Sequence, residues 1–432
     1  MEHRSGMETD PFLSSWALRD QKCIWHPFTQ AQTAAPPISI LKSKGAYLYA
    51  ESGKGYLDAI SSWWVNLHGH AHPYIAEEIT KQAKELEHVL FAGFTHPQAI
   101  ILAERLLSIL PNGYSRVFYS DNGSTAVEVA LKMAFQVVGN GKKILSFQDA
   151  YHGDTFGAMA AAGKTHYNRP FWPYLFSVHS IPPPLPGRES ESWRAFEAAI
   201  CTGEIAAFIF EPLIQGSGGM RPHCGKTLSR MIKACQTQGM ITIADEVMTG
   251  FGRTGPLFAS SSLDVTPDLI CLSKGITGGF IPLGATVAKE FLFEAFLSPD
   301  ATRAFLHGHS YTANPLVCAA ANASLDLLLQ SGCREARAMI ESEHRQFQKK
   351  WEKHPKLIRC DVVGTILAIE YRLDGASYYH PLKQRLIEFF QDKGILLRPL
   401  GNVLYVLPPY CIVRDELQTI YSTIAMTLEE WQ

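Results

Sequence analysis

Runs of apolar residues alternate with helical stretches across the middle of the chain, between about residues 117 and 287. Six of these runs are short and rich in β-branched or aromatic residues, at positions 117–120, 143–147, 205–210, 240–245, 269–273 and 284–287. Runs that are apolar on both faces and separated by helices are typical of a mostly parallel sheet covered on both sides. The pattern therefore predicts a large α/β domain, interrupted by a proline-rich loop at residues 182–187.

The pattern changes after a long helical segment that we expect near residues 313–331. Further on, an α+β module is indicated by helices near 334–353 and 383–393 and by strands within 362–371 and 403–410. The first 60 residues are loop-rich with short strands and are too few to hold a core alone. We expect residues 1–60 and 333–432 to form one small domain from both chain ends, beside a large domain at residues 61–332.

Composition and charge narrow the class of protein. The 432 residues are 46% hydrophobic and 19% charged, and their net charge is −2 without a basic stripe, so we expect a folded core and no nucleic-acid partner. No apolar run approaches the ~18–20 residues of a spanning helix, and the N-terminus lacks the apolar centre of a secretion signal. Nine scattered cysteines without a CxxC pair complete the expectation of a cytoplasmic protein with no membrane partner.

Three segments carry candidate chemistry where predicted strands end. After the first strand, free N–H groups of Gly123, Ser124 and Thr125 would form an anion site suited to phosphate. An ordinary helix cap by Ser124 or Thr125 is the alternative. Asp245 ends another strand, where it is either a structural carboxylate or the partner of a protonated ring nitrogen. Lys274 follows a third strand, and burial there would lower the pKa of its amine and prepare it for a Schiff base, unless it is a surface-turn lysine.

Together these groups are what pyridoxal phosphate requires, namely a phosphate site, a carboxylate for the ring nitrogen and a lysine amine. Tyr151, just after a further strand, adds an aromatic ring that can stack on the cofactor. Four separate segments then form one site at the carboxyl ends of the sheet.

Two other motifs suggest a dinucleotide site and a metal site, but the residues around them fit neither. Residues 250–255 read GFGRTG, but Pro256 and an aromatic loop follow where a dinucleotide site needs a helix. His68, His70 and His72 resemble a metal cluster, yet they lie in a loop and no Cys or His pair at helical spacing accompanies them. We therefore expect neither a nicotinamide cofactor nor a bound metal.

The motifs are similar to those of a known family. ADEVMTGFGRTG followed by LSKGITGG resembles the class III, fold-type I pyridoxal-phosphate aminotransferases, and the resemblance covers about residues 20–425. One branch of that family transfers an amino group from S-adenosylmethionine to 8-amino-7-oxononanoate in biotin biosynthesis, by a ping-pong reaction through pyridoxamine phosphate. The segments that resemble this branch are IWHPFTQ, SSWWVNLHGHAHP, SDNGSTAVEVALKMA, YHGDTFGAM, HGHSYTANPLVCAAA and LRPLGNVLYVLPPY.

The resemblance implies how the cofactor is held. Lys274 would form the Schiff base and shuttle a proton, Asp245 would keep the pyridine nitrogen protonated, and Tyr151 would stack on the ring. His309 and Ser310 would reach the phosphate from a neighbouring subunit, so a homodimer with shared active sites is implied. The cofactor-binding residues implied in this way are Gly123, Ser124, Tyr151, Asp245, Lys274, His309 and Ser310.

The resemblance also implies a substrate channel. Paired tryptophans supply apolar walls for a long chain, and the guanidinium of Arg398 would grip the carboxylate at its end. Asp154 and Arg253 are expected as substrate contacts or as neighbours of such contacts. The substrate-binding residues implied in this way are Phe28, Trp63, Trp64, Tyr151, Asp154, Arg253, Lys274, Gly308 and Arg398.

Phe28 departs from the family pattern, which usually has tyrosine at this position, so one hydroxyl is missing. The departure leaves the amino donor open between S-adenosylmethionine and lysine. Another class III aminotransferase of ω-amines is a further alternative, and a cofactor-free binding protein is the alternative outside enzymes.

Overall fold

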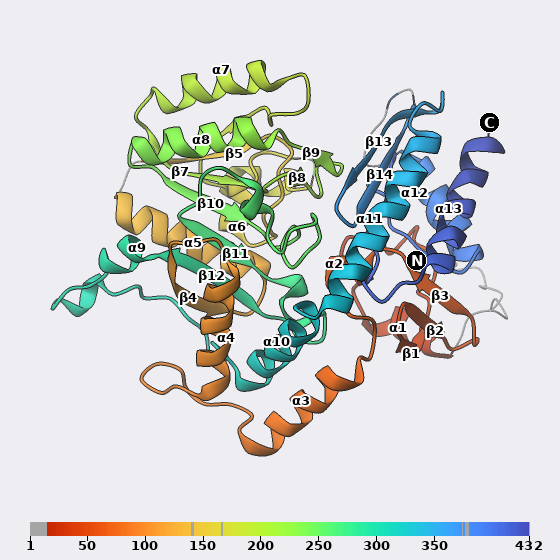
Figure 1. Ribbon diagram of the computed structural model, residues 1–432, viewed down its shortest axis with the longest axis horizontal. Coiled ribbons are helices and arrows are strands. Elements are labelled where there is room, and N and C mark those ends of the chain that lie inside the picture. The colour runs from red at the N-terminus through yellow and green to blue at the C-terminus, as the bar shows by residue number, and fades with distance from the viewer. Residues whose placement is uncertain (1–14, 140–141, 166, 374, 376–379, 432) are drawn as a thin grey trace, which may run out of the picture.

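The computed structural model describes residues 15–139, 142–165, 167–373, 375 and 380–431 (Figure 1). In this part of the chain a seven-stranded sheet has the order β4-β12-β11-β10-β7-β5-β6. Neighbouring strands are parallel except at β12, which is antiparallel to both β4 and β11. The strands are β4 (Tyr114–Ser120), β5 (Lys143–Phe147), β6 (Val178–Ile181), β7 (Ile205–Phe210), β10 (Ile241–Asp245), β11 (Leu269–Leu272) and β12 (Gly284–Lys289). The six predicted strands and the mostly parallel sheet are confirmed.

The sequence pattern does not predict β6. This edge strand has four residues, of which only Ile181 is buried, so it lacks the apolar run that marks the central strands. The proline-rich loop expected at 182–187 begins directly after it and is observed.

Helices surround the strands and join them (Figure 1). The helices expected near 313–331, 334–353 and 383–393 are α10, α11 and α12, and they differ from expectation only in their terminal turns. The α-helices are α1 (Ser15–Cys23), α2 (Ser61–Trp64), α3 (Pro73–Glu85), α4 (Pro97–Ile109), α5 (Gly123–Val138), α6 (Phe156–Ala161), α7 (Glu189–Ile200), α8 (Gly225–Thr237), α9 (Glu290–Glu294), α10 (Pro315–Leu328), α11 (Ser331–Trp351), α12 (Leu382–Asp392) and α13 (Arg414–Glu429). Short 3-10 turns are η1 (Arg169–Tyr174), η2 (Ala259–Ser262), η3 (Lys274–Thr277) and η4 (Ala301–Arg303).

Both faces of the central sheet are buried under helices. In β7, Ala207 and Ile209 belong to the apolar cluster that includes α5, whereas Phe208 and Phe210 belong to the cluster that includes α8. Because successive side chains of a strand point to opposite faces, one strand contributes to two cores. This arrangement explains why β7 is apolar at every position.

The two ends of the chain meet in one sheet. Leu57 of β3 lies opposite Ile395 of β15 in a parallel pair, so the expected packing of the N-terminal segment on the C-terminal module is observed. A second sheet, β13-β14-β16, packs against α11. The remaining strands are β1 (Ile40–Lys44), β2 (Tyr47–Ala50), β3 (Gly55–Asp58), β8 (Ile214–Gln215), β9 (Arg221–Pro222), β13 (Leu357–Val363), β14 (Ile366–Tyr371), β15 (Ile395–Leu396) and β16 (Val403–Val406).

Helix α10 packs against α3 and α4 and leads into α11. Within the described residues no single helix has the length and apolar character to cross a membrane. Helices α10 and α11 meet that criterion only when taken as a pair, which is bent by 70°.

Candidate active site

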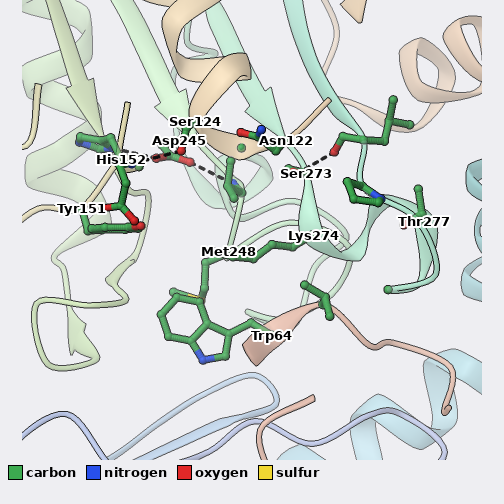
Figure 2. A pocket seen from close by; sticks show the side chains of 18 of the residues that line it. Trp64, Asn122, Ser124, Tyr151, His152, Asp245, Met248, Ser273, Lys274 and Thr277 are labelled. Carbon is green, nitrogen blue, oxygen red and sulfur yellow. Dashed lines mark hydrogen bonds and ion pairs between the residues drawn. The ribbon is translucent and has the colours of Figure 1, made fainter. Parts of the chain in front are cut away.

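A cavity of about 820 Å³ lies where five strands of the central sheet end. Its wall contains residues at or shortly after the ends of β4, β5, β7, β10 and β11, which is the edge where α/β sheets bind their ligands. The structure thus brings together the groups that the sequence places at separate strand ends (Figure 2). Those lining the cavity are Asn122, Gly123, Ser124, Tyr151, His152, Asp154, Glu211, Asp245, Val247 and Lys274.

Lys274 begins η3 immediately after β11, in the left-handed backbone region at φ 46°. Its Nζ lies 4.5 Å from the centre of the Trp64 ring, where the cation faces the aromatic π-system. Burial lowers the pKa of Lys274 to about 8, while the nearby charges of Asp245 and Glu211 act in the opposite direction. Burial thus shifts the amine toward its neutral form, which is the form that reacts with an aldehyde.

Asp245, at the end of β10, is held by two hydrogen bonds. Its Oδ2 lies 2.7 Å from Nδ1 of His152, and its Oδ1 accepts from the N–H of Val247 at 3.0 Å (Figure 2). The His152 side chain is fully buried. His152 was not predicted from the sequence, although it directly follows Tyr151 in the loop after β5. Its ring fixes the orientation of the Asp245 carboxylate.

The start of α5 faces the cavity with Gly123 and Ser124. The first N–H groups of a helix have no partner within the helix, so they are free to bind an anion. The helix cap is Asn122, which accepts from the N–H of Thr125 at 3.1 Å, while the Thr125 hydroxyl donates to Asp121. Thr125 therefore serves the capping box, and the expectation of a phosphate contact from it is wrong.

Glu211 is a second residue that the sequence analysis missed. It directly follows β7, and Asp245 is the last residue of β10, so the same rule of strand ends would have found it. Its carboxylate accepts from the N–H groups of Gly216 at 2.8 Å and Tyr151 at 3.3 Å. Burial raises the pKa of Glu211 to about 7, with His152 opposing the shift and Asp245 adding to it.

A smaller cavity of about 320 Å³ continues from Lys274 toward Arg398. We call it the substrate channel, and its lining comprises Phe28, Trp63, Trp64, Val65, Tyr151, Tyr167, Ser217, Lys274, Arg398, Pro399, Leu400 and Tyr405. The guanidinium carbon of Arg398 lies 4.7 Å from the Trp63 ring centre, and the Phe28 ring meets Trp63 edge-on at 5.6 Å. The channel is therefore lined by an amine, a guanidinium and several aromatic rings.

The two tryptophans lie on a left-handed turn. Four consecutive residues, 61–64, have φ between 45° and 76°. Such a conformation costs about 1–2 kcal/mol per residue other than glycine, so surrounding contacts must hold it. Buried Asp58 does so from β3, because its carboxylate accepts from the Ser62 hydroxyl at 2.8 Å and lies 2.8 Å from Nε2 of His70. We call Asp58 and His70 the brace of this turn.

Arg253 lies behind the channel wall. It is 1% exposed, and its guanidinium donates to the main-chain carbonyls of Trp64, Asn66 and Pro408 at 2.9–3.2 Å. Arg253 lines neither cavity in the described chain, so we assign it to the support of the tryptophan turn rather than to substrate contact. Asp154, by contrast, lines the larger cavity, where its N–H donates to the Ser124 hydroxyl at 3.2 Å.

Gly308, His309 and Ser310 lie in the loop after η4. In the described part of this chain they line neither cavity.

The histidines that resemble a metal cluster in the sequence contact different partners. His68 contacts Ser324 at 3.2 Å, while His70 contacts Asp58. Residues 250–255 form turns on which no helix opens.

The residues present fit pyridoxal phosphate. Asp245 retains lone pairs for a ring nitrogen, Lys274 supplies the amine, and the α5 start supplies N–H donors. Close approach also requires glycine here, because a Cβ on Gly123 would come within 2.7 Å of Val247. The larger cavity thus has the cation, the carboxylate and the anion site that the cofactor needs.

Comparison with known proteins agrees with this geometry. The family model described as "Aminotransferase class-III" matches residues 28–428. An adenosylmethionine-8-amino-7-oxononanoate aminotransferase of Synechococcus elongatus is 49% identical over 94% of this chain and 98% of its own, and one of Geobacter sulfurreducens is 38% identical over 96% and 97%.

Solved structures are similar over nearly the whole chain. The crystal structure of an adenosylmethionine-8-amino-7-oxononanoate aminotransferase from Methanocaldococcus jannaschii has a TM-score of 0.88 at 33% identity, covering 95% of this chain and 98% of its own. The PMP-bound form of an aminotransferase from Vibrio fluvialis has a TM-score of 0.89 at 26% identity, with 97% and 98% coverage. The chain therefore belongs to the class III aminotransferases, with the fold-type I architecture and pyridoxal 5'-phosphate as cofactor.

Proposed function

We propose that this enzyme converts 8-amino-7-oxononanoate to 7,8-diaminononanoate in biotin biosynthesis, with S-adenosylmethionine as the amino donor. The substrate channel carries this proposal, because it joins Lys274 to Arg398 between aromatic walls. The acceptor is a long apolar chain with an amino ketone at one end and a carboxylate at the other. The names of the similar proteins from Synechococcus and Geobacter support the same substrates.

We assign the cofactor contacts as follows. When bound, pyridoxal phosphate supplies an aldehyde that receives and passes on the amino group, and a ring that draws electrons from the reacting carbon. Lys274 holds and moves the proton at that carbon, for which a pKa of about 8 is suitable. Asp245 holds the proton at the ring nitrogen, while Gly123 and Ser124 bind the phosphate.

The channel residues orient the acceptor. The Arg398 guanidinium binds the carboxylate through charge-assisted hydrogen bonds, which sets the distance from the ketone to Lys274. Trp63 and Trp64 exclude water from the apolar chain and bury it. Tyr151 borders both the cofactor and the substrate, since it lines both cavities.

The proposed assembly is a homodimer with shared active sites. His309 and Ser310 would then bind the cofactor phosphate of a second subunit, and Gly308 would line its channel. Exposed apolar side chains near this loop support an interface, namely Leu90, Phe94, Leu306 and Tyr311. The His88 ring contacts Tyr311 at 5.2 Å and so joins the two segments into one surface.

We also propose how the chain divides into domains and where in the cell the protein is located. Residues 61–332 form the large domain, and residues 1–60 with 333–432 form the small one, supported by the pairing of β3 with β15. Residues 1–14, 374, 376–379 and 432 of these ranges lie outside the described part of the small domain. The described cysteines are all free thiols, which suits a reducing cytoplasm.

The test is product analysis with purified holoenzyme. With 8-amino-7-oxononanoate as acceptor, we expect mass spectrometry to detect 7,8-diaminononanoate when S-adenosylmethionine is the donor. Phe28 makes L-lysine the second donor to assay, and simple ω-amines paired with pyruvate test the broader class III alternative. Product from ω-amines with none from 8-amino-7-oxononanoate would overturn the proposal.

A further inference from the structure

A third cavity of about 870 Å³ opens on the far side of Arg398. It shares Phe28 and Arg398 with the substrate channel, so the two spaces meet at these side chains. The segment from residue 28 to 40 forms one wall, and helix α12 forms the opposite wall. We call this space the outer groove.

The outer groove combines flat apolar surfaces with amide groups. Ile38, Leu48, Tyr56 and Leu396 supply apolar and aromatic surface. On α12, the residues Gln384, Ile387 and Gln391 recur at helical spacing, so one face of the helix points into the groove. Glutamine side chains offer both donors and acceptors, which suits a ligand with mixed hydrogen-bonding edges.

The acceptor has no part that reaches this groove. Its chain ends at the carboxylate, which the proposed function places on Arg398. Of the two donors considered, L-lysine is also short. S-adenosylmethionine differs because it carries a nucleoside, which is flat, aromatic and bordered by hydrogen-bonding atoms. Bases of this kind bind to aromatic and apolar surfaces by stacking and to amides through their edges.

We propose that the outer groove binds the nucleoside of the amino donor, a purine attached through its ribose to the sulfonium amino acid. The inference rests on the proposed function and deepens it, because it gives a structural reason for S-adenosylmethionine rather than lysine. Phe28 lies at the junction of the groove and the channel, since it lines both.

The test compares two donors on matched variants. Ile387→Trp fills the groove, whereas Glu388→Trp places the same side chain on an exposed neighbouring position that does not line it. S-Methyl-L-methionine serves as the sulfonium amino acid without a nucleoside. Donor half-reactions are followed on holoenzyme by the loss of the visible cofactor band, and acceptor half-saturation is measured separately.

We expect Ile387→Trp to raise the half-saturation concentration of S-adenosylmethionine about tenfold, the loss typical of one stacked base. Glu388→Trp should leave it unchanged, and neither variant should alter the values for S-methyl-L-methionine or the acceptor. Binding of 5'-deoxy-5'-methylthioadenosine, measured by calorimetry, should be lost in Ile387→Trp alone. Gln384→Trp, at an exposed position on the rim, replaces Ile387→Trp if that variant does not fold.

Two results would overturn the inference. An unchanged S-adenosylmethionine half-saturation in the folded groove variants would exclude the nucleoside from the groove, while turnover of that donor would leave the proposed function intact. If the wild-type enzyme accepts L-lysine but not S-adenosylmethionine, both the proposed donor and the proposed role of the groove are wrong.

Discussion

The cofactor cavity and the substrate channel share Lys274 and Tyr151, but the chain builds them differently. Most polar groups of the cofactor cavity lie at or shortly after the ends of strands in one sheet that is buried on both faces. The channel instead joins the N-terminal segment, a strained turn and Arg398 near the C-terminus. The proposed reaction chemistry thus depends on the ends of strands in one sheet, whereas the proposed substrate contacts depend on segments that loops and turns position.

Lys274→Ala is expected to give the largest difference between the two regions, because it should abolish the chemistry of the cofactor cavity and spare binding to the channel. Without the amine, the reaction loses the group that binds the cofactor and moves the proton, so we expect kcat to fall by at least about 10³-fold. Acceptor binding to the channel should persist in calorimetry. Lys289→Ala is the control, since Lys289 pairs with Asp268 away from the cavity. A borohydride-reducible cofactor adduct retained in Lys274→Ala would contradict the assignment.

Arg398→Ala tests the opposite end of the channel. Loss of the guanidinium leaves the acceptor carboxylate unpaired, so its half-saturation concentration should rise by about 10–100-fold. The cofactor spectrum should be unchanged, because Arg398 does not line the larger cavity. Steady-state kinetics with varied 8-amino-7-oxononanoate measures the effect. An unaltered half-saturation would place the carboxylate elsewhere.

The brace of the tryptophan turn links the two regions. In Asp58→Ala the Ser62 and His70 groups lose their acceptor, so we expect the turn to relax and kcat/KM for the acceptor to fall about tenfold. Asp58→Asn keeps an acceptor oxygen and should recover part of that loss. Equal losses in both half-reactions, with a large fall in Tm, would indicate general destabilisation instead of positioning.

The pKa of Lys274 predicts how cofactor uptake depends on pH. Burial lowers this pKa to about 8, so the neutral amine is scarce below that pH and predominates above it. The rate at which apoenzyme regains its visible band with saturating cofactor should rise about tenfold between about pH 7 and pH 9. An amine with the ordinary lysine pKa would still be gaining rate steeply above pH 9.

Phe28→Tyr is expected to give the smallest effect. Restoring the hydroxyl adds one hydrogen bond at most, so donor half-saturation should change by about 2–10-fold. Phe28 is 51% exposed, so the added oxygen has room and Tm should hardly move. The half-saturation concentrations of both donors in this variant show which donor the restored hydroxyl contacts. No change with either donor would remove Phe28 from donor recognition.

The sequence predicts the cofactor cavity well because each group has a local signal. Asp245 and Lys274 stand at the ends of apolar runs, and strand ends converge on one edge of a parallel sheet. Thr125 was misassigned because helix capping depends on which side chain turns back, and Asn122 takes that role here. Glu211 follows the same rule of strand ends as Asp245 but belongs to no motif that the sequence analysis used.

The channel could be predicted only through family resemblance. The left-handed turn at residues 61–64 contains no glycine that would mark it in the sequence. Contacts from β3 and from Arg253 offset its strain instead. Arg398 meets Trp63 only after the two ends of the chain pair through β3 and β15. Such long-range placement leaves no local pattern in the sequence.

The visible spectrum of one holoenzyme sample, recorded through both half-reactions, tests the donor and the acceptor together. Addition of S-adenosylmethionine should remove the cofactor's visible band, and 8-amino-7-oxononanoate should then restore it. A band that L-lysine removes while S-adenosylmethionine does not would contradict the donor. A band that 8-amino-7-oxononanoate fails to restore would show that this channel does not hold that acceptor.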